Sequence, residues 1–192
     1  MSCKNPLIPP HVDGSTCHIC SDAWLGTDIP AVLNSSAKMV HASKLPDGAT
    51  QKQGIAMLQD HEFFLACNPH MQKFEALGEV SEPVLPEGIK PLGPTTLYKV
   101  TDIVETLPKG IWGSSVESSY EFTDTELGTF CALKSPLNVN MHTFWSIEEK
   151  DGGLELVEAS EIKCSKLLIG IVKSLNEGGC ECLYHLPLHI HQ

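Results

Sequence analysis

The segment Ile162–Leu175 (IKCSKLLIGIVKSL) constrains the fold of this chain more than any other stretch. Its apolar residues recur at helical spacing and form one stripe, while Lys163, Lys166 and Lys173 lie outside that stripe. The pair Gly178-Gly179 just beyond it is a typical stop signal for a helix. We therefore expect a long C-terminal helix whose apolar face packs against another layer. The stripe consists of Cys164, Leu167, Leu168, Ile171, Val172 and Leu175.

The sequence before this helix supplies that layer, because several runs alternate between apolar and polar residues as β-strands do. Turn residues separate the runs, among them Pro108-Lys109-Gly110 and the hairpin signal Asp151-Gly152-Gly153. A late helix packed on an antiparallel sheet is an α+β arrangement, and a sheet that curves around the helix encloses a pocket. The expected strands are Thr96–Leu107, Ser115–Phe122, Thr129–Leu133, Asn138–Glu148 and Leu154–Glu161.

The first half of the chain begins with an irregular extension over residues 1–36, and we expect the ligand-binding domain over residues 37–192. Ala37–Leu45 predicts a first strand. Thr50–Leu65 predicts a helix that ends before Asn68-Pro69, since the residue before proline avoids helical geometry. We interpret Met71–Leu77 as one more helical turn, and Ser81–Pro94, which holds four prolines, as a loop or an edge strand.

Length and charge exclude several classes of function. The 192 residues suffice for one domain with a sizeable core. The net charge of −11 argues against nucleic-acid binding and against docking on anionic lipids, because both need clustered Lys and Arg. No apolar run approaches the length of a membrane span. The start MSCKNPLIPPH lacks the apolar core of a secretory signal, so we expect a cytoplasmic protein with reduced thiols.

The motifs of metal and cofactor enzymes are missing or incomplete. Cys17-His18-Ile19-Cys20 is half of a metal site, but Cys180 and Cys182 have the wrong spacing to complete a zinc knuckle. We expect free thiols and no structural metal. The sequence has no Gly-rich phosphate loop, no nucleophile elbow and no H-E-x-x-H, so we expect no cofactor.

The order of elements resembles the helix-grip order of START-like proteins, the SRPBCC superfamily. The motifs LQDHEFFLACNPH, TLYKVTDIVETLPKG, SSYEFTDTELG, LKSPLNV and HTFW are similar, in this order, to an uncharacterised START-like family common in filamentous fungi. Tyr98 before Thr101-Asp102, the turn at 107–110 and Trp145 match best, and the likeness covers about residues 37–176. The resemblance implies the fold and a pocket rather than one reaction.

Asp102 is the sharpest candidate for chemistry. It lies between Val100 and Val104 on the strand face that we place toward the helix, and desolvation there raises the pKa of a carboxyl group. Such a group serves as a general acid or base near neutral pH, with Tyr98 and Tyr120 as donors to a substrate carbonyl. The alternative is that Asp102 bonds backbone groups or starts a bulge and has a structural role only.

His142 is the second candidate for proton transfer. The alternation places it with Asn138 and Asn140 on the outer, solvated face, while Trp145 points inward. A bulge at Pro136 would reverse this register and turn His142 inward, where its near-neutral pKa suits a base. His61 is expected at the surface, or else at the mouth of the pocket. The ligand-binding residues we expect are Val100, Trp112, Phe122, Met141, Trp145, Leu168 and Ile171, with a plain loop anchor as the alternative for Trp112.

Two functions fit these features. The leading interpretation is a cofactor-independent cyclase, isomerase or dehydratase of fungal-type secondary metabolism, acting on a polyketide- or terpenoid-like molecule, as the START-like resemblance implies. The alternative is a non-catalytic carrier of a lipid or other hydrophobic small molecule, which needs the same pocket and no acid. An interaction module that uses residues 1–36 is a third option, and the sequence leaves open whether the chain is a monomer or a homodimer.

Overall fold

The computed structural model describes residues 34–174 apart from 84, 104–114 and 137. These residues form two short helices and seven strands, and no helix among them is long and apolar enough to cross a membrane. In chain order the elements are β1 (Asn34–Lys44), α1 (Gln51–Gln59), α2 (His61–Ala66), β2 (Met71–Val80), β3 (Thr95–Ile103), β4 (Ser115–Thr125), β5 (Gly128–Ser135), β6 (Val139–Lys150) and β7 (Gly153–Ser165).

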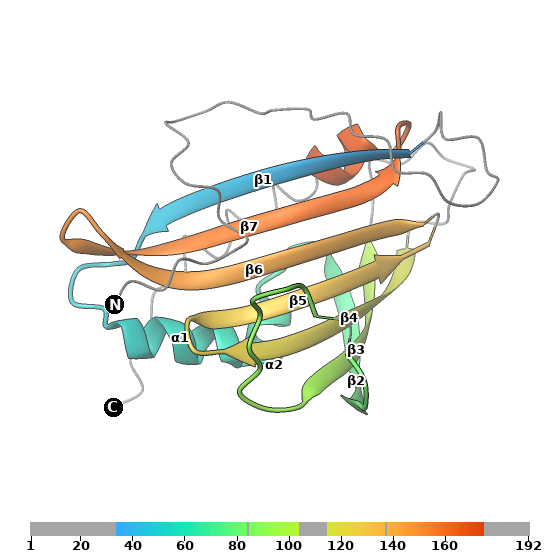
Figure 1. Ribbon diagram of the computed structural model, residues 1–192. Helices are drawn as coiled ribbons and strands as arrows, with labels where there is room; N and C mark the ends of the chain where they lie inside the picture. The colour runs from blue at the N-terminus through green and yellow to red at the C-terminus, as the bar shows by residue number, and fades with distance from the viewer. Residues whose placement is uncertain (1–33, 84, 104–114, 137, 175–192) are drawn as a thin grey trace.

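The strands form one antiparallel sheet in the order β1-β7-β6-β5-β4-β3-β2. Each strand from β2 to β6 pairs with the next one in the chain, and β1 forms the far edge by pairing with β7. The sheet is curved, and α1 and α2 lie along one of its faces (Figure 1). We call this face the inner face. The antiparallel sheet predicted from the alternating runs is confirmed.

The strand register explains which side chains share the inner face, because residues directly opposite each other in an antiparallel pair point to the same side. Tyr98 pairs with Tyr120, Tyr120 with Leu133, Leu133 with Met141, and Met141 with Ile162. The polar–apolar alternation of each strand therefore adds up to a continuous inner surface across five strands.

Helix α1 approaches the sheet closely at Gly54. A Cβ atom at this position would lie 2.9 Å from Cγ1 of Ile147 on β6, so glycine permits a contact that a side chain would push apart. Thr50 and Gln53 form a capping box at the start of the helix. The side chains of Gln51 and Gln59 donate to the backbone oxygens of Ile147 and Thr125, which fixes α1 to the sheet at both ends.

The single helix predicted over Thr50–Leu65 is wrong in one respect, because Asp60 divides it into α1 and α2. Asp60 ends α1 and also caps α2, where its side chain accepts a hydrogen bond from the backbone N–H of Phe63. Aspartate at an N-cap is a strong local signal for a new helix start. The break turns α2 so that Phe64 and Leu65 reach the sheet.

The helical turn predicted over Met71–Leu77 is wrong, because this segment is part of the edge strand β2. Most of its residues are exposed, so the burial pattern that marks a strand is weak in its sequence. Pairing with β3 supplies the hydrogen bonds that the polar backbone of this segment requires.

The predicted C-terminal helix also starts later than expected. Ile162 and Cys164 belong to β7, where they point inward, and the backbone turns at 166–168 before a helical stretch over 169–174. Leu167, counted in the predicted apolar stripe, is 84% exposed. Residues 162–165 pair with β1, and 162 and 163 pair with β6 as well, so backbone hydrogen bonds outweigh a helical periodicity here. The remainder of the predicted helix, from Leu175, lies outside the described residues.

The segment 81–94 between β2 and β3 covers the outer face of the sheet. Leu85 and Ile89 pack on a buried cluster of Phe130, Ala132 and Phe144. The backbone N–H of Leu92 donates to the backbone oxygen of Asp124. The outer face is therefore partly packed rather than fully solvated.

Candidate functional site

The inner face carries two apolar clusters. The first, which we call the helix-side cluster, lies under α1 and α2 and is composed of Leu58, Phe64, Leu65, Tyr98, Val100, Phe122, Cys131, Trp145, Ile147 and Leu156. The second, the C-terminal cluster, joins the sheet to the segment after β7 and is composed of Met39, Val139, Ile162 and Cys164 with Met141, Leu168, Ile169 and Val172 packed on them.

Each cluster combines buried residues with half-buried ones at its margin. Val100 and Phe122 of the helix-side cluster are fully buried, and Trp145 packs edge-on against Phe64 with 4.6 Å between the ring centroids. In the C-terminal cluster Met141 and Leu168 are only half-buried. The helix-side cluster has half-buried residues at its margin as well, among them Phe74 and Tyr120, so both clusters present apolar surface that a ligand can cover.

The predicted ligand residues divide accordingly. Val100, Phe122 and Trp145 belong to the helix-side cluster, while Met141 and Leu168 belong to the C-terminal cluster. Ile171 is half-buried in the helical stretch 169–174, where the contacts with the sheet come from its neighbours. Trp112 and Val104 lie outside the described residues.

Asp102 lies near the end of β3, opposite Val116 on β4 and Met71 on β2. Tyr120 Oη donates to its Oδ2 at 3.3 Å, and Asn68 Nδ2 donates to its Oδ1 at 3.2 Å. Burial raises the pKa of Asp102, against the opposing effects of the Tyr120 hydrogen bond and of His70. The carboxyl group thus combines a raised pKa with two side-chain donors.

Tyr120 and Tyr98 occupy neighbouring positions on the inner face, since they pair across β3 and β4. Burial, followed by the charge of Asp102, raises the pKa of Tyr120 well above its ordinary value. The hydroxyl therefore keeps its proton and donates a hydrogen bond to Asp102. Tyr98 is 6% exposed and meets His61 and Phe122 edge-on. Burial raises its pKa as well. Its ring is part of the core.

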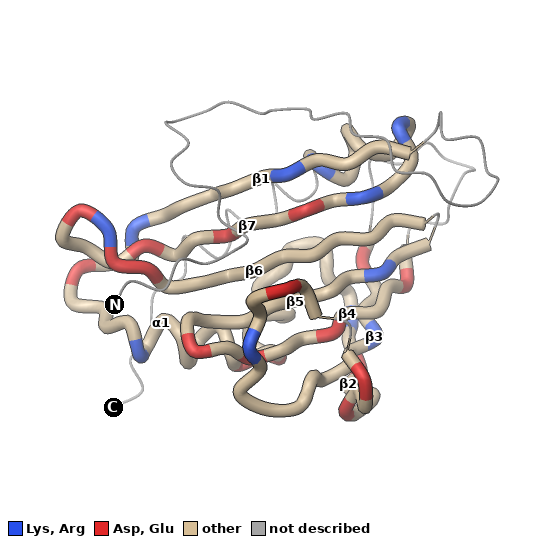
Figure 2. Tube along the Cα trace, in the orientation of Figure 1, with Lys and Arg blue, Asp and Glu red and all other residues tan. Residues whose placement is uncertain are grey.

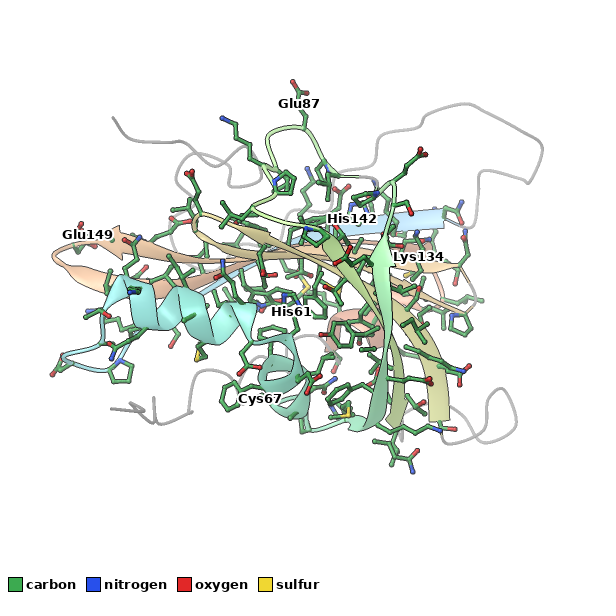
Figure 3. All side chains as sticks on the ribbon, turned by 90° about the horizontal axis from the view of Figure 1, so that it is seen from below. His61, Cys67, Glu87, Lys134, His142 and Glu149 are labelled. Carbon is green, nitrogen blue, oxygen red and sulfur yellow. The ribbon has the colours of Figure 1, made fainter. Side chains whose placement is uncertain are left out.

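The prediction that His61 lies at the surface is wrong, because its side chain is only 10% exposed. Its Nε2 lies 2.9 Å from Oδ1 of Asp124, and its ring stacks on Phe122 with 4.7 Å between centroids. The same Oδ1 accepts from the hydroxyl of Thr129. Figure 3 shows His61 between the helices and the sheet. This His–Asp pair was not predicted, because the two residues lie 63 positions apart in the chain.

His142 lies on the outer face, where the unbulged register of β6 places it, and Trp145 points inward. Its ring meets Phe130 edge-on, and Figure 3 shows it on the side of the loop that carries Glu87. Burial, followed by the charge of Lys163, lowers the pKa of His142. The packing of segment 81–94 makes this face less solvated than predicted, and His142 stands apart from Asp102 on the other side of the sheet.

The described residues contain no group of three or more His, Cys, Asp or Glu side chains arranged to hold a metal ion. Cys17, Cys20, Cys180 and Cys182 lie outside the part of the chain that the structure describes. Burial raises the pKa values of Cys131 and Cys164, so these core thiols remain protonated.

Sequence reasoning also missed Glu158, which is 1% exposed on the inner face of β7. The run LELVEASE carries glutamates on both faces, so alternation alone did not mark one of them as buried. The available signal was the sequence Leu154, Leu156, Glu158, Ser160 on the face that continues to Ile162.

Solved structures resemble this chain in fold. Ara h 8.0201 aligns with 79% of this chain and 95% of its own length, at 14% identity and a TM-score of 0.51. The Thermus thermophilus protein TTHA0849 aligns with 77% of this chain and 90% of its own, at 12% identity and a TM-score of 0.50. A START superfamily protein from Mycobacterium smegmatis aligns over 79% and 91%, at 14% identity and a TM-score of 0.46.

At such low identity these likenesses show the fold alone, and the predicted helix-grip fold is confirmed. No curated protein matches the sequence. A protein family does match, over residues 34–178, which include every described strand and helix. The chain belongs to this family, whose description is domain of unknown function DUF7053.

Proposed function

We propose that the protein binds a hydrophobic small molecule at the C-terminal cluster, between the inner face of β6, β7 and β1 and the segment 168–172. One observation carries this proposal: Met141, Leu168, Ile169 and Val172 are apolar, lie against the inner face, and remain half-buried. Apolar side chains left partly in water at a concave surface gain free energy when a ligand covers them, by roughly 25 cal/mol per Å². Ligand sites in proteins are built in this way, from apolar walls and a few polar groups.

Leu168 and Leu167 provide a matched test, because they are adjacent but only Leu168 packs on the cluster. The neutral fluorescent probe N-phenyl-1-naphthylamine should bind wild-type protein and Leu167→Trp equally. Leu168→Trp fills the space beside the cluster, so its affinity for the probe should fall at least about tenfold, which corresponds to 1.4 kcal/mol. Fluorescence titration measures all three affinities. Equal binding by Leu168→Trp would move the site away from this cluster.

A second function, proton transfer on a small molecule that extends along the inner face to β3, is favoured by Asp102, although β4 and β5 separate its strand from β6 of the C-terminal cluster. Its raised pKa and its hydrogen bond from Tyr120 support a role as general acid or base in a cofactor-independent isomerisation, cyclisation or dehydration. Each carboxyl oxygen retains a further lone pair for a substrate beyond the Tyr120 and Asn68 contacts. The turnover of the Asp102→Asn variant distinguishes this function from binding alone.

A further inference from the structure

A row of polar side chains crosses the inner face beside the C-terminal cluster. The register of the sheet defines it, because each member stands directly opposite the next on the neighbouring strand and so points to the same side. In order across β1, β7, β6, β5 and β4 the row is His41, Glu158, Trp145, Thr129 and Asp124. Trp145 packs in the helix-side cluster, which fixes the whole row on the inner face.

Glu158 lies between His41 and Trp145 in this row. Ser160 Oγ donates to its Oε1 at 2.9 Å, and the hydroxyls of Ser160 and Thr143 lie 2.9 Å apart. A carboxyl group that is 1% exposed requires such hydrogen bonds, since burial of an unpaired acid is costly. The sheet therefore holds a polar acceptor in a fixed position on an otherwise apolar face.

Two nitrogen atoms beside Glu158 have no hydrogen-bond partner within the described part of the chain. They are Nε1 of Trp145 and Nε2 of His41, and both atoms are buried. Trp145 is 8% exposed as a residue. Folded proteins leave few buried donors unpaired, so each such atom requires an explanation. The indole N–H is a donor only, and it needs an acceptor atom that the described residues do not provide.

The row and the C-terminal cluster fit the two ends of one molecule. On β7, Glu158, Ser160 and Ile162 point to the same face, and on β1 Met39 of the cluster shares a face with His41 in the same way. Ile162 lies four positions after Glu158, a distance of about 13 Å along a strand at roughly 3.3 Å per residue. An elongated apolar molecule can lie along the cluster with one polar end at the row.

We propose, on the basis of the proposed hydrophobic-ligand function, that the preferred ligand is an apolar alcohol whose hydroxyl group binds at this row. A hydroxyl oxygen accepts from Trp145 Nε1–H, and its hydrogen is donated to the Glu158 carboxyl or to His41 Nε2. A hydrocarbon leaves the indole donor unpaired. A carboxylate accepts from the indole but brings a second carboxyl group next to Glu158, and two carboxyl groups that share one buried site do not readily both ionise.

The test compares decanol with decanoate as competitors of N-phenyl-1-naphthylamine, which has no oxygen acceptor. Trp145→Phe removes the donor, so the ratio of decanol affinity to probe affinity should fall roughly fivefold to tenfold, about one hydrogen bond. Glu158→Gln keeps an acceptor for Ser160 and removes the competing carboxyl group, so decanoate affinity should rise roughly tenfold. Glu161→Gln, on the outer face of the same strand, is the control and should change neither affinity.

A second measurement uses the wild-type protein and so does not depend on the folding of any variant. In spectra of protein labelled with ¹⁵N at the indole, decanol should shift the Trp145 Nε1–H resonance downfield, and the probe alone should not. If the probe binds but the indole resonance does not respond to decanol and the variants do not separate the competitors, the polar row is not a ligand site and the proposed function stands. If the probe does not bind, the proposed function and this inference both fail.

Discussion

At the scale of single residues, Asp102 shows how one acid can be structural or catalytic. Its oxygens accept from Tyr120 and Asn68, which ties β3 to β4 and to the turn before β2. Its pKa is nevertheless raised from 3.8, chiefly by burial. The hydrogen bonds therefore only partly compensate for the loss of water, and the ionised form is less favoured in the folded protein than in the unfolded chain.

The Asp102→Asn variant separates the two roles. If Asp102 moves a proton, the amide should lower turnover by roughly 10²–10⁴-fold with little change in probe affinity. The sign of the stability effect follows from the raised pKa. The folded state holds the proton more tightly than the unfolded chain, so wild-type protein loses stability as the pH rises from about 4 through the folded pKa.

The variant lacks this titration, so its free energy of unfolding relative to wild type should increase between about pH 4 and pH 7. Urea unfolding at several pH values measures this difference, with the exposed Asp47→Asn as the control. A relative stability that does not change with pH would contradict the raised pKa. Unchanged turnover together with the expected pH effect would assign Asp102 to structure alone.

At the scale of elements, the contact between β5 and β6 depends on one glycine. Gly128 begins β5, and a Cβ atom there would lie 2.1 Å from the backbone oxygen of Trp145. A backbone atom cannot rotate away as a side chain can, so the strands themselves would have to separate. Gly128 pairs with Ser146, next to Trp145, which belongs to both the polar row and the helix-side cluster.

Gly128→Ala should therefore lower the free energy of unfolding by roughly 1–3 kcal/mol or more, the usual cost of overpacking. Gly93→Ala is the matched control, because a Cβ atom at Gly93 has nothing within 4 Å. Its effect should stay within about 0.5 kcal/mol, as for other surface substitutions. Chemical denaturation of both variants measures this free energy. A similar decrease for the two variants would show that β5 and β6 accommodate a Cβ atom at Gly128 at little cost.

At the scale of the whole molecule, each face of the sheet is covered in parts by different segments. Helices α1 and α2 cover one part of the inner face, the segment 168–172 contacts another, and segment 81–94 packs on the outer face. Figure 2 shows charged residues gathered at turns such as the β6–β7 hairpin and spaced singly along β1 and β7. The proposed ligand site at the C-terminal cluster joins the sheet to segment 168–172, so a ligand there would contact both parts of the fold.

Ligand binding should therefore stabilise the entire domain. At a free probe concentration of about 100 times Kd, linkage adds about 2.7 kcal/mol to the free energy of unfolding. For a chain of this size this corresponds to a rise in Tm of roughly 5–10 °C. Calorimetry with and without N-phenyl-1-naphthylamine measures the shift. Leu167→Trp should keep the shift and Leu168→Trp should lose it, whereas an equal shift in both would indicate binding elsewhere.

The sequence by itself determined most of the sheet, the hairpin at Asp151-Gly152-Gly153 and the inward face of β3, β4 and β6. Alternation with period two is a local property that survives in any antiparallel partner arrangement. It also placed Asp102, Tyr120, Met141 and Trp145 on one surface. Tertiary structure alone decided where β7 ends, because pairing with β1 and β6 extends the strand through a segment whose spacing also suits a helix. It alone brought His61 to Asp124 and set His41 and Trp145 beside Glu158, since these contacts join residues far apart in the chain. No local pattern encodes such distances; the strand register does, and the register is fixed only when the apolar faces of all the strands are buried together.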